Sequence, residues 1–347
     1  GGGAMARKVV GLDIDYSGIK VAEVVRKGRA KMVTKIGSVS LPAGTVVDGK
    51  VTDVQTLSHG LERLLLEQEI SARSAVLGLR STWVTVKTHR LPKMPKKELD
   101  KALEFEVPEL VSFPVHSPQD VSYDYFVNTE SDKEVEIVLV ACPRQHLNPY
   151  IDAIRAAGLT LEAIDLPALN WAELLNGETR RAFVEISEEQ TTIQVALGGV
   201  FKVLRVVPVG TKHFREGVQE AFECGSDEAR NLCANRSLDF LLMEGPGSKR
   251  VIRATVQQFV GSVLQTLDFV RAQERATRFS TMLDEVVLLG DLADLSGLTA
   301  MLAEEVDLPV RSLKQMENFH ANFDFMRPSQ FSGYGSALAM GWGGVDE

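Results

Sequence analysis

Two acidic turns, about half the chain length apart, are the part of the sequence best suited to chemistry. Asp13 lies near the end of the apolar run 9–14 and precedes a small-residue turn, and Glu185 holds the same position in the run 182–186. A tight turn after a strand can bring backbone N–H groups against phosphate oxygens. Two such turns facing each other across a cleft could hold a triphosphate, with Asp13 and Glu185 contacting Mg²⁺ through water.

The elements around these turns repeat along the chain. Each acidic turn is followed by a second strand, a glycine-containing turn and a third strand, at residues 19–25 and 31–39 in the first half and 191–197 and 201–207 in the second. Helically spaced apolar residues follow each set; they are Val54, Leu57, Leu61, Leu64 and Leu65, and then Phe214, Val218 and Phe222. A single repeat at this distance predicts two related α/β domains.

Residues 91–143 fit neither copy of the repeat. The proline-punctuated loop 91–95 leads into a helical pattern at 96–107, which Pro108 is expected to end. Two strands separated by a polar turn follow, at 123–127 and 135–141. We therefore expect a small inserted α/β subdomain. The remaining patterns predict helices at 144–157, 249–276 and 333–341 and strands at 161–166 and 285–289.

The composition excludes several classes of protein. The chain has 347 residues, 38 Lys and Arg against 47 Asp and Glu, and a formal net charge of −9. An acidic chain argues against a dedicated nucleic-acid binder, which needs a basic face. No apolar stretch reaches the ~18–20 residues of a membrane-spanning helix. The three cysteines predict reduced thiols, and the six histidines show no metal-ligand spacing.

Several stretches resemble a known family. Residues 11–21 are similar to the first phosphate loop of the actin-like ATPase superfamily, and residues 91–99 resemble the entry to an inserted subdomain of the type IV pilus assembly protein PilM family. The proline-rich entry favours this family over its cell-division relative FtsA. The other matching stretches are 141–144, 157–159, 163–165, 207–210, 228–230 and 333–339.

This resemblance implies an α/β, actin-like fold of two RNase H-like domains. It divides the chain into a first core domain at 5–90 and 144–178, the insert at 91–143, a second core domain at 179–331 and a C-terminal helix at 332–347 that returns to the first. It also implies a nucleotide site made by Asp13, Asp15, Ser17, Gly18, Lys20, Glu185, Ser187, Thr191, Gly210, Gly290, Asp291 and Gly335, with Asp13 and Glu185 toward the metal.

The departures from the family pattern predict that this nucleotide site is degraded. Asp15 stands where the family usually has glycine, Ser187 stands where the second loop usually has glycine, and Asp291 replaces one of a glycine pair. Two like charges ~4 Å apart repel by about 4 kcal/mol at an effective dielectric of ~20, so Asp15 is expected to oppose a phosphate. We expect ATP with magnesium to bind weakly or not at all, without significant turnover.

The first functional hypothesis is an adaptor at the cytoplasmic face of the inner membrane. The resemblance implies a PilN-like bitopic membrane protein as partner, whose cytoplasmic N-terminal tail would bind beside the insert, with other pilus machinery components as further partners and no nucleic acid. The partner-binding residues expected are Leu91, Met94, Leu99, Leu103 and Phe105. The alternative for these five is that they form the core of the insert itself.

Two other functions remain open from the sequence. One is an active ATPase that gates assembly, in which Glu185, Asp13 or Glu188 would position the attacking water. The other is the cytoplasmic domain of a GspL-like type II secretion protein, a family in which a membrane helix follows this fold.

Overall fold

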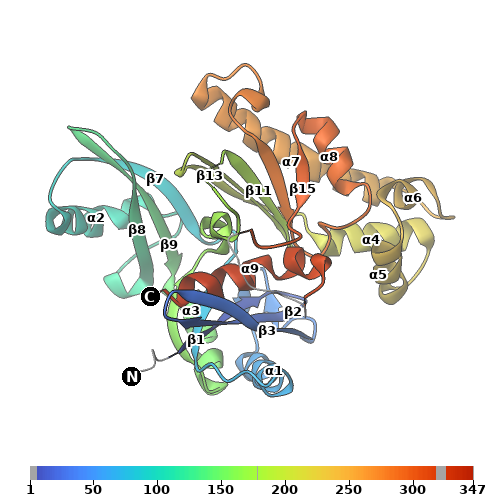
Figure 1. Ribbon diagram of the computed structural model, residues 1–347, viewed down its shortest axis with the longest axis horizontal. Coiled ribbons are helices and arrows are strands. Elements are labelled where there is room, and N and C mark those ends of the chain that lie inside the picture. Colours follow the sequence, from blue (N-terminus) through green and yellow to red (C-terminus); the bar gives the residue numbers. More distant parts are fainter. Residues whose placement is uncertain (1–5, 178, 318–325, 347) are drawn as a thin grey trace.

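Two five-stranded mixed sheets with the same topology lie at the centre of the molecule (Figure 1). The computed structural model describes residues 6–177, 179–317 and 326–346. In each sheet an antiparallel three-stranded meander is extended by two parallel strands. The first sheet has the order β10 (Thr160–Asp165), β6 (Ser74–Gly78), β1 (Arg7–Ile14), β2 (Gly18–Lys27), β3 (Ala30–Ser40). The second has β15 (Val310–Ser312), β14 (Glu285–Leu289), β11 (Arg181–Ile186), β12 (Thr191–Leu197), β13 (Val200–Val207).

The strand register makes the two acidic residues equivalent. Asp13 on β1 lies beside Gly78 of β6, and Glu185 on β11 lies beside Leu289 of β14. Two residues further along, Arg80 follows β6 and Asp291 follows β14. The predicted duplication is therefore confirmed, and it extends to the residues that leave the neighbouring parallel strands.

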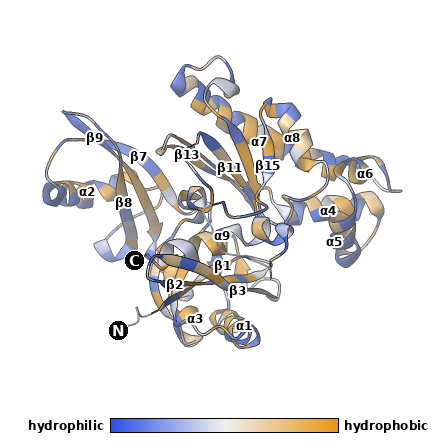
Figure 2. Ribbon diagram, viewed as in Figure 1, coloured by the Kyte–Doolittle hydropathy of each residue, from blue (hydrophilic) through white to orange (hydrophobic). Residues whose placement is uncertain are grey.

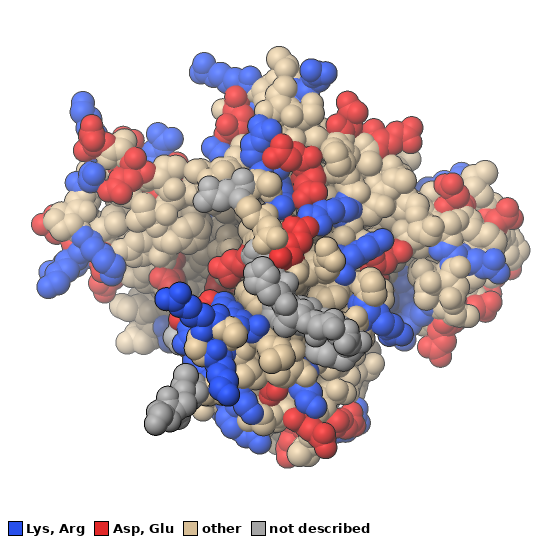
Figure 3. Space-filling view, viewed as in Figure 1, with Lys and Arg blue, Asp and Glu red and all other residues tan. Residues whose placement is uncertain are grey.

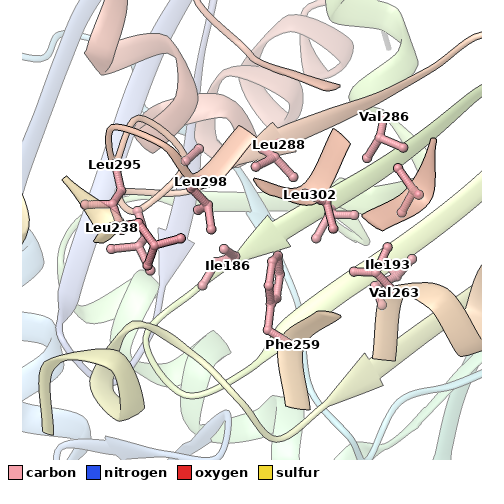
Figure 4. Close-up of a cluster of buried hydrophobic side chains, with 14 of the residues drawn as sticks. Ile186, Ile193, Leu238, Phe259, Val263, Val286, Leu288, Leu295, Leu298 and Leu302 are labelled. Carbon is pink, nitrogen blue, oxygen red and sulfur yellow. The ribbon is translucent and has the colours of Figure 1, made fainter. Parts of the chain in front are cut away.

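Each sheet has its own apolar core. Helices α1 (Val54–Glu67) and α3 (Arg144–Ala156) pack against the first sheet. The second sheet is covered by α4 (Thr211–Phe222), α5 (Ser226–Asn235), α6 (Leu238–Met243), α7 (Arg250–Glu274) and α8 (Leu298–Val306). Figure 4 shows Phe259 and Val263 of α7 against strand residues such as Ile186 and Leu288. The spacing of apolar residues on α1 and α4 follows the predicted helical pattern.

The C-terminal helix α9 (Pro328–Gly344) lies between the two sheets (Figure 1). It begins five residues earlier than the predicted 333, because Pro328 suits the first turn and the Gln330 side chain accepts a hydrogen bond from the Arg327 N–H at 2.8 Å. Its side chains share one core with residues of β1, β2 and β14. Gly11 permits this approach, since a Cβ there would lie 2.1 Å from the carbonyl oxygen of Ala337.

The insert, together with the strand that leads into it from residue 85, forms a separate three-stranded sheet that projects from one side of the molecule (Figure 1). Its order is β7 (Thr85–Pro92), β9 (Glu134–Pro143), β8 (Val121–Glu130), and α2 (Lys96–Leu110) packs on one face. The expected end of α2 at Pro108 is wrong: the helix continues to Leu110, because a proline near the end removes one hydrogen bond while the Val111 N–H still reaches the Val107 carbonyl at 3.2 Å.

Short elements complete the chain, namely the hairpin β4 (Val46–Val47) and β5 (Lys50–Val51) and 3₁₀ turns at Pro118–Asp120, Pro167–Leu169, Trp171–Leu174 and Phe279–Thr281. Figure 2 shows that apolar residues concentrate on the central strands and on the inward faces of the helices. In the part of the chain that the structure describes, no helix is both long enough and apolar enough to span a bilayer.

Candidate functional site

A cleft of about 720 Å³ lies between the two core domains. It is lined by six of the twelve residues that the sequence predicted for a nucleotide site: Asp13, Asp15, Ser17, Gly18, Lys20 and Asp291. Acidic residues outnumber basic ones along the cleft; the acids are Asp13, Asp15, Glu188, Asp291 and Asp294, and the bases are Lys20, Arg215 and Arg230. The topology therefore brings the two acidic turns together, into an acidic environment.

Arg80 joins Asp13, which lines this cleft, to Glu185, which lies behind it. Its Nη1 donates to Asp13 Oδ1, and its Nε and Nη2 donate to Glu185 Oε1 and Oε2 at 2.6 and 3.0 Å. The three side chains are 6% (Arg80), 9% (Asp13) and 5% (Glu185) exposed. Burial lowers the pKa of Arg80, but Asp13 and Glu185 outweigh it and raise that pKa above its usual value. Arg80 is thus a permanently charged bridge between the domains.

Two further side chains complete this network. Ser336 of α9 donates to Glu185 Oε2, and Gln190 Nε2 of the second domain donates to the carbonyl oxygen of Arg80 at 2.9 Å. Each oxygen of Glu185 therefore has a donor. The network connects β1 and the residue after β6 in the first domain with β11 and α9.

Asp15 accepts hydrogen bonds from other residues of the first acidic turn. Its Oδ1 accepts hydrogen bonds from the N–H and hydroxyl of Ser17, at 2.9 and 2.7 Å, and from the N–H of Gly18 at 3.3 Å. Burial raises the pKa of Asp15 and the neighbouring Asp13 raises it further, against the opposing effects of Arg80 and Ser17. The backbone N–H groups of this turn, which were predicted to bind a phosphate, thus donate to the Asp15 side chain.

Lys20 makes a second ionic contact between the domains. Its Nζ lies 2.6 Å from Asp291 Oδ1 and donates to the Gly333 carbonyl at 2.8 Å. Burial lowers the pKa of Lys20, but Asp291 and Asp13 raise it by more, so the net shift is upward. This lysine is paired across the cleft rather than directed at open space.

The second acidic turn is held by its own hydrogen bonds. Ser187 Oγ donates to the Gln190 carbonyl at 2.8 Å, and the buried Thr191 Oγ1 donates to the Val209 carbonyl at 2.6 Å. Gly210 begins α4 against this turn, where a Cβ would lie 2.4 Å from the Ser187 carbonyl oxygen. These three predicted residues have structural roles here and do not line the cleft.

Gly290 and Gly335 allow close packing beside the cleft. Gly290 has φ +101°, and a Cβ there would lie 2.1 Å from the Ile186 carbonyl oxygen. At Gly335 on α9 a Cβ would lie 2.6 Å from Leu289 Cδ2. Neither residue lines the cleft, so both predicted positions are close-packing points of the sheet and of α9.

The residues present do not fit a magnesium site. Mg²⁺ requires free carboxylate or water oxygens in near-octahedral geometry, whereas Asp13 Oδ1 and both oxygens of Glu185 accept hydrogen bonds from Arg80 and Ser336. Elsewhere in the described ranges there is no cluster of three or more His, Cys, Asp or Glu side chains that could hold a metal ion. The predicted metal ligands thus contact a guanidinium and a hydroxyl.

Arg80 is the site residue that the sequence reasoning missed. The signal was available: Arg80 follows Gly78 and Leu79 at the end of a short apolar run, and parallel strands in one sheet end at the same edge. Arg215 was missed too; it pairs with Glu188, with side chains 11% and 7% exposed. Arg80 neutralises Asp13 and Glu185 from opposite domains, and Arg215 neutralises Glu188 within the second domain.

A second hollow, a groove of about 630 Å³, lies between the insert and the first core domain. One wall is the face of β8 and β9 that carries Phe126 and Val140, and the opposite wall is β10 with the α3 residues Leu147 and Ile151. Strand β8 ends the insert's sheet and β10 ends the first central sheet. The groove therefore has both apolar and polar groups in its lining and an edge strand on each side.

The five predicted partner-binding residues lie outside this groove. Leu91, Leu99 and Leu103 are buried in the insert's own core, which is the alternative that the sequence left open, and Met94 packs against that core. Phe105 is 87% exposed on α2. Exposed aromatic side chains also occur on β8, where Tyr123 and Phe126 line the groove.

Acidic and basic side chains both occur over the face shown in Figure 3. Along the groove, Asp124, Glu162 and Asp165 accompany the single arginine Arg155. Glu162 is paired with Arg7 at 2.5 Å. The groove thus combines apolar side chains with acidic ones, which outnumber its basic residues.

Comparisons with solved structures agree with this architecture. A chain of the PilM-PilN type IV pilus biogenesis complex superposes with a TM-score of 0.83 at 21% identity, over 98% of this chain and 99% of that chain. The ethanolamine utilization protein EutJ from Carboxydothermus hydrogenoformans gives 0.57 at 14% identity, over 96% and 90%. MreB 5 of Spiroplasma citri bound to AMPPNP gives 0.51 at 11% identity, over 96% and 94%.

The duplicated topology and these likenesses define the class: the chain has the actin-like ATPase fold. The family model of the type IV pilus assembly protein PilM matches residues 11–343. The chain therefore belongs to the PilM family of type IV pilus assembly proteins, as the resemblance in its sequence implied.

Proposed function

We propose that this protein is an adaptor that binds the extended cytoplasmic tail of a PilN-like bitopic protein at the cytoplasmic face of the inner membrane. Family membership supports this function, and so does the likeness to a chain of a PilM-PilN complex. The observation that carries the proposal is the groove between two edge strands, β8 and β10.

The geometry suits an extended peptide. An edge strand presents backbone N–H and C=O groups to which another strand can add, while alternate side chains enter pockets. Phe126, Leu147 and Ile151 offer apolar contacts along the groove. The acidic side chains of Asp124 and Asp165 favour a tail that carries Lys or Arg near its apolar residues.

We also propose that ATP binds weakly at best and is not turned over at a significant rate. Glu185 and Asp13, which would have to position water or metal, are both engaged by Arg80, and Glu188 is engaged by Arg215. Isothermal titration of ATP with Mg²⁺ tests this proposal. A dissociation constant in the low micromolar range would contradict it.

The tail-binding proposal is tested with a synthetic peptide that matches the N-terminal tail of the neighbouring bitopic membrane protein. Fluorescence polarisation measures its affinity for the full chain and for two matched variants. Phe126→Ala, on the groove wall, should weaken binding by about 10-fold or more, as truncation of an aromatic hot spot does. Phe105→Ala removes an equally large exposed side chain of the insert and should change the affinity by less than about twofold.

Two outcomes contradict the groove as the binding site. One is an equal effect of both variants, and the other is a loss confined to Phe105→Ala, which would favour the exposed face of α2. A tail with N-methylated backbone amides at alternate positions adds a second test, because strand addition requires those N–H groups. Undiminished binding of that analogue would exclude pairing with β8 or β10.

A further inference from the structure

Side chains of opposite charge join the two domains beside the interdomain cleft. The guanidinium of Arg80 lies between Asp13 and Glu185, binds Glu185 through two N–H groups and is almost completely buried. A planar guanidinium matches a carboxylate in this bidentate way and stays charged at all accessible pH values. A divalent cation bridging the same two carboxylates would have to displace it.

The first acidic turn, which the sequence predicts to bind phosphate, likewise has its N–H groups hydrogen-bonded to a residue of the chain itself. Asp15 Oδ1 occupies the N–H groups of Ser17 and Gly18, and these are the donors that a phosphate oxygen would need. A phosphate that binds here would therefore have to displace the Asp15 carboxylate, which belongs to the same turn. It would also approach a cleft in which Asp13 and Asp291 are already present.

Two of the three cations that line the cleft are held in short ion pairs, whereas the third, Arg230, lies 3.7 Å from the exposed Asp227. Lys20 reaches across to Asp291, and Arg215 binds Glu188 within the second domain. Arg80 and Asp291 occupy equivalent positions after β6 and β14, and each contacts a charged residue of the opposite domain. The duplicated fold thus places two ionic contacts between the domains at related positions.

We propose that the chain supplies its own ionic ligands in this cleft: Asp15 takes the place of a phosphate oxygen within the first turn, and Arg80 takes the place of a divalent cation. The Arg80 and Lys20–Asp291 contacts between the domains then hold them closed without nucleotide. Because these groups are tethered to the chain, closure does not depend on the concentration of any ligand. This inference goes beyond tail binding and does not depend on it.

The first test uses the unaltered full chain. Small-angle scattering and thermal unfolding are measured in EDTA, in MgCl₂ alone, and with ATP or ADP plus MgCl₂. The proposal expects the same radius of gyration in all four conditions and midpoints within about 1 °C. Ligand present at 100 times its dissociation constant should shift the midpoint of a protein of this size by several degrees. Compaction or such a shift with Mg·ATP would overturn the proposal.

The second test removes the internal cation. Arg80→Gln leaves two buried carboxylates without a positive partner, so the unfolding midpoint should fall by about 4–7 °C and the radius of gyration should increase. Millimolar MgCl₂ should recover part of both changes in this variant and neither in the unaltered chain. Arg215→Gln is the matched control, because its ion pair with Glu188 lines the same cleft but lies within one domain. It should lower the midpoint without changing the radius of gyration.

A radius of gyration for Arg80→Gln equal to that of Arg215→Gln would overturn the proposal, as would the absence of any response to MgCl₂. Asp15→Gly provides an independent reading if Arg80→Gln does not fold. It frees the N–H groups of Ser17 and Gly18, so ATP should now raise the midpoint by several degrees where it does not in the unaltered chain. No response of Asp15→Gly to ATP would contradict the role given to Asp15.

Discussion

The cleft between the core domains and the groove beside the insert differ in how far their polar groups are already satisfied. In the cleft, Asp13, Glu185 and Arg80 bind one another. In the groove, strands β8 and β10 each end a sheet, and aromatic side chains such as Phe126 are 40% exposed. A hollow whose charges are internally paired stabilises the fold, whereas one with edge strands and exposed apolar groups is suited to binding a partner.

The difference follows from the elements that build each hollow. The cleft is formed by strand ends from both domains, where neighbouring parallel strands deliver Asp13 and Arg80 to one point. The groove is formed where the separate sheet of the insert meets the first central sheet, and β8 and β10 are the terminal strands of those two sheets. Charged loop ends thus meet in the cleft, and strand edges meet in the groove.

The largest expected effect is the difference in unfolding free energy lost when a carboxylate is removed beside the cleft and when one is removed at the groove. Glu185→Ala leaves Arg80 with one carboxylate and Ser336 without its acceptor, so the free energy of unfolding should fall by about 3–5 kcal/mol. Glu162→Ala removes the partly exposed pair with Arg7 at the groove and should cost less than about 1 kcal/mol. Urea unfolding of both variants measures the difference. Equal losses of unfolding free energy would contradict the difference between buried, paired charges at the cleft and a partly exposed ion pair at the groove.

An intermediate effect tests the contact between the groove wall and the second domain. Asn128 of β8 accepts from the Phe201 N–H at 2.8 Å and donates to the Phe201 carbonyl at 2.9 Å. Asn128→Ala should lower the free energy of unfolding by about 1–2 kcal/mol, since two backbone groups lose their partner.

The matched control for that variant is Asn235→Ala, an exposed asparagine whose side chain bonds only within α5. It should cost less than about 0.5 kcal/mol in the same urea titration. Similar values for the two variants would mean that the insert and the second domain are energetically independent.

The smallest expected effect is the pH dependence of the stability contributed by Glu162, which lines the groove. The hydrogen bond from Arg7 lowers the pKa of Glu162 below its usual 4.5. Between the folded and unfolded pKa the unfolded chain binds more protons, so this contribution to stability is complete above about pH 5 and is lost as the pH falls through the folded pKa.

Glu162→Gln removes that contribution. The stability difference between this variant and the unaltered chain should therefore be measurable by urea unfolding at pH 7 and should shrink toward pH 4. Glu304→Gln, at an exposed position of α8, is the matched control for a Glu-to-Gln substitution. A difference that grows on acidification would contradict the assigned shift.

The sequence predicted the duplicated fold because its strands are short, β-branched and repeated. Asp13 and Glu185 could be matched from their positions at equivalent strand ends, and the register confirms that match. The groove residues could not be found in this way. Leu99 and Leu103 have the apolar character of a binding surface, but helical spacing alone does not tell an inward face from an exposed one, and they form the core of the insert.

The sequence by itself determined the class of fold and the acidic character of the first turn, because strand patterns and turn residues act over a few neighbouring positions. The tertiary structure decided that Arg80 bridges Asp13 and Glu185 and that β8 and β10 border a groove. These partners lie far apart along the chain, so only the packing of the sheets determines which charges meet and which strand edges stay free.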